Sequence, residues 1–264
     1  MDGNLIQINN RQVFGYIHEP VGSDQSKLPV LICPSLGHEY YRTHWCIRRL
    51  TTQLTRSGFT VGRFDYSGTG DSAGSLNDVA SIQQWMEDTY GMACHLQNIT
   101  ESPQIHVLGL RMGAIFAAAV AATGMVDELV LWEPTRSAKH MLDQWRCMHE
   151  TMIDLWMTPL KTVDDGRSEE ILGAIYPRPI LDELESFTFG NIADLKCTTA
   201  TVVSTRKQLE WEQEGYQQRV VEEPSDWEQL SMIEQAWLPT QSPSSIRQIL
   251  AQSALSKPIV HPVA

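Results

Sequence analysis

The sequence predicts an α/β fold: a wound, mostly parallel sheet with helices on both faces and an inserted helical cap. Short apolar runs alternate with segments of helical spacing between residues 29 and 134, which is typical of strands joined by crossover helices. Runs such as PVLICP lack polar alternation, as expected of strands covered on both faces. Between residues 137 and 190 this alternation gives way to a helical stretch rich in Met and Trp.

The predicted elements follow in order from the N-terminus. LIQINN and QVFGYIH alternate apolar and polar residues around Asn9 and Asn10, which predicts a hairpin. Ile47, Leu50 and Leu54 have helical spacing, and Gly58 fits the end of that helix. Strands are predicted at 29–34, 59–64, 104–110, 127–134, 199–205 and 218–222, with helices at 44–58, 80–96, 112–123 and 242–255, the last with an N-cap serine.

The cap is predicted from HMLDQWRCMHETMIDLWM and from a second apolar helix near ILDELESF. Its Met and Trp residues recur at helical spacing, which fits either core packing or a lid over an apolar pocket. They stand at positions 141, 145, 148, 152, 156 and 157. We therefore expect one domain over 1–264, with 137–190 as its inserted cap.

Composition excludes several functional classes. A net charge of −12 argues against nucleic acid and anionic membrane surfaces as partners. The first residues lack the features of a signal peptide, and the longest apolar stretch is shorter than a membrane span needs, so we expect a cytoplasmic protein. Five scattered cysteines without a C-x-x-C pair indicate neither a disulfide framework nor a zinc site, and no metal or cofactor is expected.

The stretch HVLGLRMGA has the outline of a strand, a sharp turn and a buried helix. In the G-x-S-x-G nucleophile elbow, the middle position is a serine on a strained turn. Here Arg111 stands at that position, between Gly109 and Gly113. We expect Arg111 at the N-terminus of a helix, with the two glycines allowing the strand and helix to approach closely.

Three motifs in order carry a resemblance: CPSLGHEYYRTH, RFDYSGTGDSAG and GLRMGA, extended by LWEP. With the cap, they make the whole chain similar to α/β-hydrolases, and in particular to the serine aminopeptidase S33-like group that includes exosortase-associated hydrolases. The resemblance implies a catalytic serine, a histidine base and an acid. It also implies that CPSLGHEY forms the oxyanion-hole loop.

None of the three catalytic groups stands at its expected place. An arginine stays protonated and cannot attack a carbonyl. No histidine occurs between His149 and His261, so the loop EEPSDWEQL cannot supply the base, and the segment after TATVVST offers Glu210 as its nearest carboxylate. The sequence therefore predicts that the triad is absent, as in a pseudoenzyme.

Arg111 has two interpretations. A guanidinium at a helix N-terminus could bind a carboxylate or phosphate, or Arg111 could pair internally with Glu133 or Glu39 and fill the former site. The candidate ligand-binding residues, expected to face one pocket, are Arg111, Met112, Gly37, His38, Leu36 and Glu133. A rebuilt pair of Cys33 or Ser35 with His38 is a further alternative.

Three functions remain open. The first is a non-catalytic protein that binds a small anionic or acyl ligand, or a protein partner, in a biosynthetic pathway. The second is an active hydrolase or acyltransferase with a rebuilt site, and the third is a scaffold. The fold cannot choose among them, and the apolar cap fits a dimer face as well as a pocket.

Overall fold

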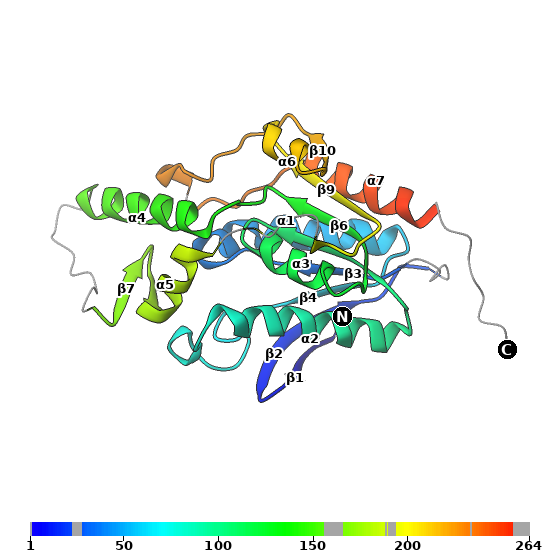
Figure 1. Ribbon diagram of the computed structural model, residues 1–264, viewed down its shortest axis with the longest axis horizontal. Coiled ribbons are helices and arrows are strands. Elements are labelled where there is room, and N and C mark those ends of the chain that lie inside the picture. Colours follow the sequence, from blue (N-terminus) through cyan, green and yellow to red (C-terminus); the bar gives the residue numbers. More distant parts are fainter. Residues whose placement is uncertain are drawn as a thin grey trace.

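A computed structural model describes residues 2–22, 28–155, 166–187, 189, 194–232 and 234–255. Its centre is an eight-stranded sheet in the order β1-β2-β4-β3-β5-β6-β9-β10. β1 and β2 pair antiparallel, as do β2 and β4, and the other neighbours are parallel. The predicted wound, mostly parallel sheet is confirmed (Figure 1).

The strands lie close to their predicted positions. The predicted hairpin turns at Asn9 and Asn10, and Asn9 takes the left-handed conformation with φ of 51°. The strands of the sheet are β1 (Asp2–Ile8), β2 (Arg11–His18), β3 (Val30–Cys33), β4 (Val61–Phe64), β5 (Ile105–Leu110), β6 (Val126–Trp132), β9 (Thr199–Ser204) and β10 (Gln217–Val220). Every residue of β3, β5 and β6 is buried, because helices cover both faces of these strands.

Helices cover each face of the sheet with an apolar stripe. One face packs against α2 (Ile82–Thr100) and α3 (Gly113–Ala121), and the other against α1 (Gly37–Arg56) and α7 (Gln241–Leu255). Trp85 and Phe116 lie in the first core cluster, and Leu50 and Leu250 lie in the second. The sheet is therefore a middle layer between two helical layers.

The predicted cap segment is less helical than expected. It contains α4 (Ala138–Leu155) and α5 (Arg178–Ser186), as predicted, but an antiparallel hairpin of β7 (Ser168–Ile171) and β8 (Ala174–Pro177) lies between them. Figure 1 shows α4, β7 and α5 together at the left of the view. The predicted Trp156 and Met157 lie outside the described residues.

The C-terminal region departs from prediction in two details. The short helix α6 (Leu209–Gln213) was not predicted. The predicted N-cap serine is wrong, because Ser242 lies inside α7 and Glu223 accepts hydrogen bonds from the amides of Thr240, Gln241 and Ser242. A carboxylate at a helix N-terminus satisfies unpaired amides and interacts favourably with the helix dipole. His261 lies outside the described residues.

Candidate functional site

The turn between β5 and α3 is a strained elbow headed by Arg111. Arg111 has φ of 54°, a left-handed conformation that is unfavourable for a side chain of this size. Its amide donates to the carbonyl of Trp132 at 3.0 Å. A Cβ on Gly109 would lie 2.4 Å from the Cα of Ala114, and one on Gly113 would lie 2.3 Å from the Pro34 carbonyl oxygen. The predicted elbow, with two glycines required by close packing, is confirmed.

The Arg111 guanidinium is held by groups of the protein itself. Its Nη2 lies 2.9 Å from Glu39 Oε1, and its Nε lies 3.1 Å from Glu39 Oε2. It also lies 4.8 Å from the ring centre of Trp227. Arg111 is 8% exposed and Glu39 is fully buried. The pair is bidentate and sequestered, which fits the internal-pairing interpretation of Arg111.

A cavity of about 410 Å³ opens beside this elbow. Of its charged lining groups, Arg111, Arg136 and Arg206 are cations and Glu133, Asp226 and Glu228 are anions. Arg136 pairs with Glu214, and Asp226 pairs with Arg42. The cavity therefore has no excess of positive charge, and its arginines are a poor basis for an anion site.

Glu133, the residue directly after β6, has a second strained conformation, with φ of 45°. Its Oε1 accepts a hydrogen bond of 2.6 Å from the amide of Thr205, just after β9. Burial raises the pKa of the Glu133 carboxyl. It contacts Arg111 through its backbone, because Arg111 Nη1 lies 3.4 Å from the Glu133 carbonyl oxygen. Glu133 thus borders the elbow cavity but does not neutralise Arg111 by a direct ion pair.

Three other candidate residues line a different cavity. Leu36, Gly37 and His38 border a space of about 210 Å³ between the loop after β3, the loop after β4 and the β7–β8 hairpin. Gly37 has φ of 58°, and a Cβ there would lie 2.6 Å from the hydroxyl of Tyr176. The cap hairpin and the first turn of α1 therefore form opposite walls of one small cavity.

His38 is the unusual group of this second cavity. It is 8% exposed, and within the described ranges neither ring nitrogen has a hydrogen-bond partner. Burial lowers the pKa of His38 to about 4, so the ring is neutral at pH 7 and carries one donor and one acceptor. Its ring meets Trp145 edge to face at 5.0 Å between centroids.

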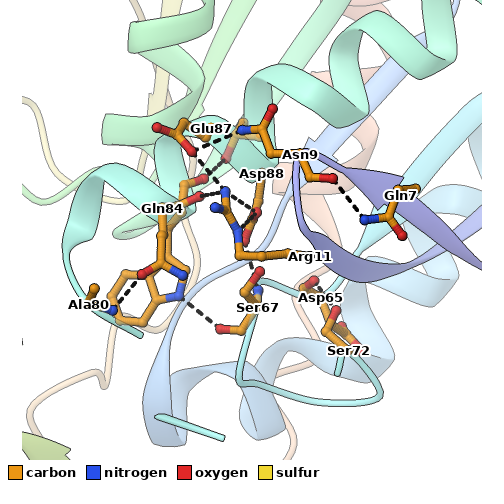
Figure 2. Close-up of polar contacts among 12 residues, drawn as sticks. Gln7, Asn9, Arg11, Asp65, Ser67, Ser72, Ala80, Gln84, Glu87 and Asp88 are labelled. Carbon is orange, nitrogen blue, oxygen red and sulfur yellow. Dashed lines mark hydrogen bonds and ion pairs between the residues drawn. The ribbon is translucent and has the colours of Figure 1, made fainter. Parts of the chain in front are cut away.

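The third wall is the glycine-rich loop of residues 65–74, which is held by carboxylates. Asp65 Oδ2 accepts from the amide of Asp71 at 3.0 Å, and Asp88 Oδ2 accepts from the amide of Ser67 at 2.8 Å. Figure 2 shows Asp88 bound to Arg11 next to this loop. Asp65 thus has a structural role that shapes the cavity wall.

The six candidate residues therefore do not face one pocket. Arg111 and Glu133 border the elbow cavity, whereas Leu36, Gly37 and His38 border the second. Met112 is fully buried in the core, where its side chain packs with the α3 face. The expectation of one shared pocket is wrong, because a wall of packed side chains separates the two groups.

Trp145 of α4 belongs to that wall. Its indole Nε1 lies 3.4 Å from Glu39 Oε1, and its ring packs against His38 and Tyr176. The sequence pattern predicts Trp145 as a core or lid residue, whereas it gives no indication of Tyr176 or Trp227. No local pattern marks these two, since each acts on a residue more than 100 positions away.

The rebuilt nucleophile alternatives have clear positions. Cys33 is fully buried in β3, and desolvation raises the pKa of its thiol, which disfavours the reactive thiolate. Ser35 Oγ lies 2.9 Å from Thr43 Oγ1, so its hydroxyl is engaged with α1. Ser35 nevertheless lines the same cavity as His38.

Solved structures with this fold span the whole chain. Est1E from Butyrivibrio proteoclasticus matches at a TM-score of 0.63 with 11% identity, covering 97% of this chain and 99% of that one. Proline iminopeptidase from Mycobacterium smegmatis matches at 0.61 with 12% identity, covering 97% and 99%. A thermophilic esterase from Thermogutta terrifontis, in a malate-bound structure, matches at 0.61 with 18% identity, covering 96% and 98%.

No curated protein sequence matches the chain. Within the described ranges, no helix combines the length and apolar character that crossing a bilayer requires. The serine aminopeptidase S33 family matches residues 28–163, from the start of β3 into the cap. That match and the wound sheet together show that the chain belongs to the serine aminopeptidase S33 family of α/β-hydrolase fold proteins.

Proposed function

We propose that this protein binds a small uncharged acyl ligand, such as an amide, in the His38 cavity, and does so without a Ser-His-Asp triad. The observation that carries this proposal is the neutral, buried His38 ring with two unpartnered nitrogens. A buried polar atom without a partner costs roughly 1–3 kcal/mol. A ligand that supplies one acceptor and one donor removes that cost.

The lining of the cavity favours an uncharged ligand with an apolar body. Aromatic and aliphatic side chains form most of the wall, including Tyr40, Trp85, Tyr176 and Leu76. A carbonyl oxygen accepts from the imidazole N–H, and an amide N–H donates to the other nitrogen. A free carboxylate is disfavoured, because the nearby cations Arg111 and Arg42 are already paired with Glu39 and Asp226.

The residues at the elbow favour a binding function over catalysis by a Ser-His-Asp triad. Arg111 takes the place at which the family's motif has serine, and Trp227 occupies the loop after β10, which in the resemblance carries the base. Arg111 is held in a bidentate ion pair with Glu39 and in a cation–π contact with Trp227, so neither residue can act as a nucleophile or a base at the elbow.

An active hydrolase is the second candidate function, and one observation favours it. His38 is neutral, hence competent as a general base, and it lines the same cavity as the Ser35 hydroxyl. In this arrangement Ser35 would have to turn from Thr43 toward His38 before it could attack an acyl carbon. An anionic ligand at the elbow, a protein partner and a scaffold role have no comparable feature in their favour.

The binding proposal is tested with benzamide and butyramide as probes, by calorimetric titration. We expect saturable binding to the wild type and its loss in His38→Phe, which keeps the ring volume and removes both nitrogens. His44→Phe is the matched control, because His44 lies on the same helix and is exposed. No binding of either amide to the wild type, or equal binding to His38→Phe, contradicts the proposal.

The hydrolase alternative is tested with a fluorophosphonate probe and short p-nitrophenyl esters. We expect no labelling and background hydrolysis, because loss of a serine hydrolase nucleophile costs on the order of 10⁶ in kcat. Arg111→Ser is expected to stay inactive, since base and acid are also missing. Stoichiometric labelling of the wild type that disappears in Ser35→Ala would establish the alternative.

A further inference from the structure

A third cavity, of about 590 Å³, lies away from both sites described above, next to the ends of β2 and α1. Its titratable and charged lining residues are His18, Glu19, Arg48 and His95. His18 is buried, whereas Glu19 and Arg48 are exposed at its rim. A residue of the neighbouring strand that contacts His18 determines what this cavity can bind.

That residue is Arg63, in β4, directly opposite Tyr16 of β2. Its guanidinium lies 5.3 Å from the centre of the Tyr16 ring, and its Nε donates to His18 Nε2 at 3.1 Å. Arg63 is half-buried, and burial lowers its pKa. Within the described ranges, Arg63 makes no ion pair.

Arg63 differs from Arg42 and Arg111 in its lack of a carboxylate partner among the described residues. Arg42 and Arg111 each have a carboxylate oxygen within 2.9 Å, as desolvated cations require. Asp65, the acid nearest to Arg63 along the chain, instead accepts hydrogen bonds from Tyr40 and from the amide of Asp71. Among the described residues Arg63 therefore has no carboxylate in direct contact, and Asp65 attracts its positive charge from beyond ion-pair distance.

The hydrogen bond from Arg63 also fixes the state of the His18 ring. Because Nε2 accepts the Arg63 N–H, a neutral ring carries its proton on Nδ1. Burial lowers the pKa of His18 to about 4, so this neutral form holds at pH 7. His18 thus offers the cavity an N–H donor, and the cation behind it polarises that donor.

Arg48 supplies a second cation at the cavity. It lies on α1, with its guanidinium 5.4 Å from the centre of the Trp45 ring, and among the described residues it too makes no ion pair. Glu19 is the one carboxylate among the described lining residues of this cavity. Two arginines against one exposed acid give a local positive excess in a chain whose net charge is −12.

We infer that this cavity is a binding site for a small oxyanion, a carboxylate or phosphate group, held between the His18 Nδ1–H and the Arg48 guanidinium, with Arg63 as the charge behind His18. Nδ1–H and the guanidinium are the donors that such oxygens accept from. The volume of the cavity leaves room for the body of a larger molecule. This inference is independent of the acyl ligand proposed for the His38 cavity.

The test is calorimetric titration of the wild type with sodium phosphate and, separately, sodium acetate, at constant ionic strength set with sodium chloride. We expect saturable binding of at least one of them, and the preferred probe identifies the group as phosphate or carboxylate. Arg48→Gln is expected to weaken that binding about tenfold, the effect of one charge-assisted contact. Arg49→Gln, an exposed neighbour on the same helix, is expected to leave it unchanged.

Nitrogen-15 spectra of the histidine rings give an independent readout. We expect His18 to be the Nδ1–H tautomer, and its Nδ1 signal to shift during the titration and to stay still in Arg48→Gln. The inference is overturned if neither anion binds, if Arg48→Gln and Arg49→Gln bind equally, or if the His18 signal is indifferent to a bound anion. Each of these readouts avoids substitution of the half-buried Arg63.

Discussion

The elbow and the His38 cavity lie on opposite sides of Trp145, and they differ in how their polar groups are satisfied. At the elbow, Arg111 is neutralised by Glu39 and covered by Trp227. In the cavity, both nitrogens of His38 lack a partner within the described residues. The place that resembles a catalytic centre is thus filled from within the chain, while the neighbouring cavity keeps unused hydrogen-bonding capacity.

The largest expected effect breaks the pair at the elbow. Glu39→Gln leaves the Arg111 charge buried without a counterion, so we expect the free energy of unfolding to fall by about 3–5 kcal/mol in urea titrations. The double variant Glu39→Met with Arg111→Met removes both charges and is expected to be more stable than Glu39→Gln. If the single variant is as stable as the wild type, the elbow is not a closed ion pair.

The pH dependence of the unfolding free energy tests the state of His38 in its cavity. The pKa of His38 is lowered from 6.5 to about 4 in the folded protein, so the unfolded chain binds more protons between these two values. Stability is therefore full above pH 6.5 and falls as the pH drops toward 4, by about 3 kcal/mol from this residue. The pKa of His18 is lowered to the same value, and His18 adds a loss of the same sign.

His38→Phe is expected to remove its own share of that loss, which flattens the unfolding free energy between pH 6.5 and 4. His140→Phe is the control, because His140 is exposed on α4. A profile for His38→Phe that is as steep as that of the wild type would mean that His38 titrates normally in the folded state.

Gly37→Ala probes the boundary of the His38 cavity. The left-handed backbone at this position strains any side chain, and the added Cβ would meet the Tyr176 hydroxyl at 2.6 Å. We expect a loss of about 1–3 kcal/mol in thermal or urea unfolding, together with weaker binding of benzamide. Gly22→Ala is the control, since its φ of 113° is also positive but nothing lies within 4 Å of its Cβ position. Equal losses in both variants would assign the effect to the backbone alone.

The smallest expected effect concerns the Trp227 ring, which packs against the Arg111 guanidinium. Trp227→Leu keeps an apolar side chain and removes the ring that faces the guanidinium at 4.8 Å. We expect a loss of about 1–2 kcal/mol beyond that of a matched change at Trp237, which packs against Trp227 and Trp132, whereas the cation–π contact of Arg111 is with Trp227. Trp237→Leu is that matched variant. A smaller loss at 227 than at 237 would show that packing, and not the cation, explains the role of Trp227.

The sequence by itself determined the wound sheet and the elbow. Buried parallel strands read as continuous apolar runs, and the turn at Gly109, Arg111 and Gly113 is encoded within nine residues. The absence of a histidine between 149 and 261 was likewise visible in the sequence alone. Periodicity, chain-breaking residues and residue identity are local features, so they can be recognised from the sequence alone.

Only the tertiary structure decided the partners and the pockets. Glu39 and Glu133 were equal candidates for Arg111, and the fold placed the carboxylate of Glu39, 72 positions away, against the guanidinium. The strands β7 and β8 have four residues each, too few to show alternation, and packing against α4 and α5 holds them. Contacts between distant segments depend on how helices and strands pack, and that information does not reside in any short window of sequence.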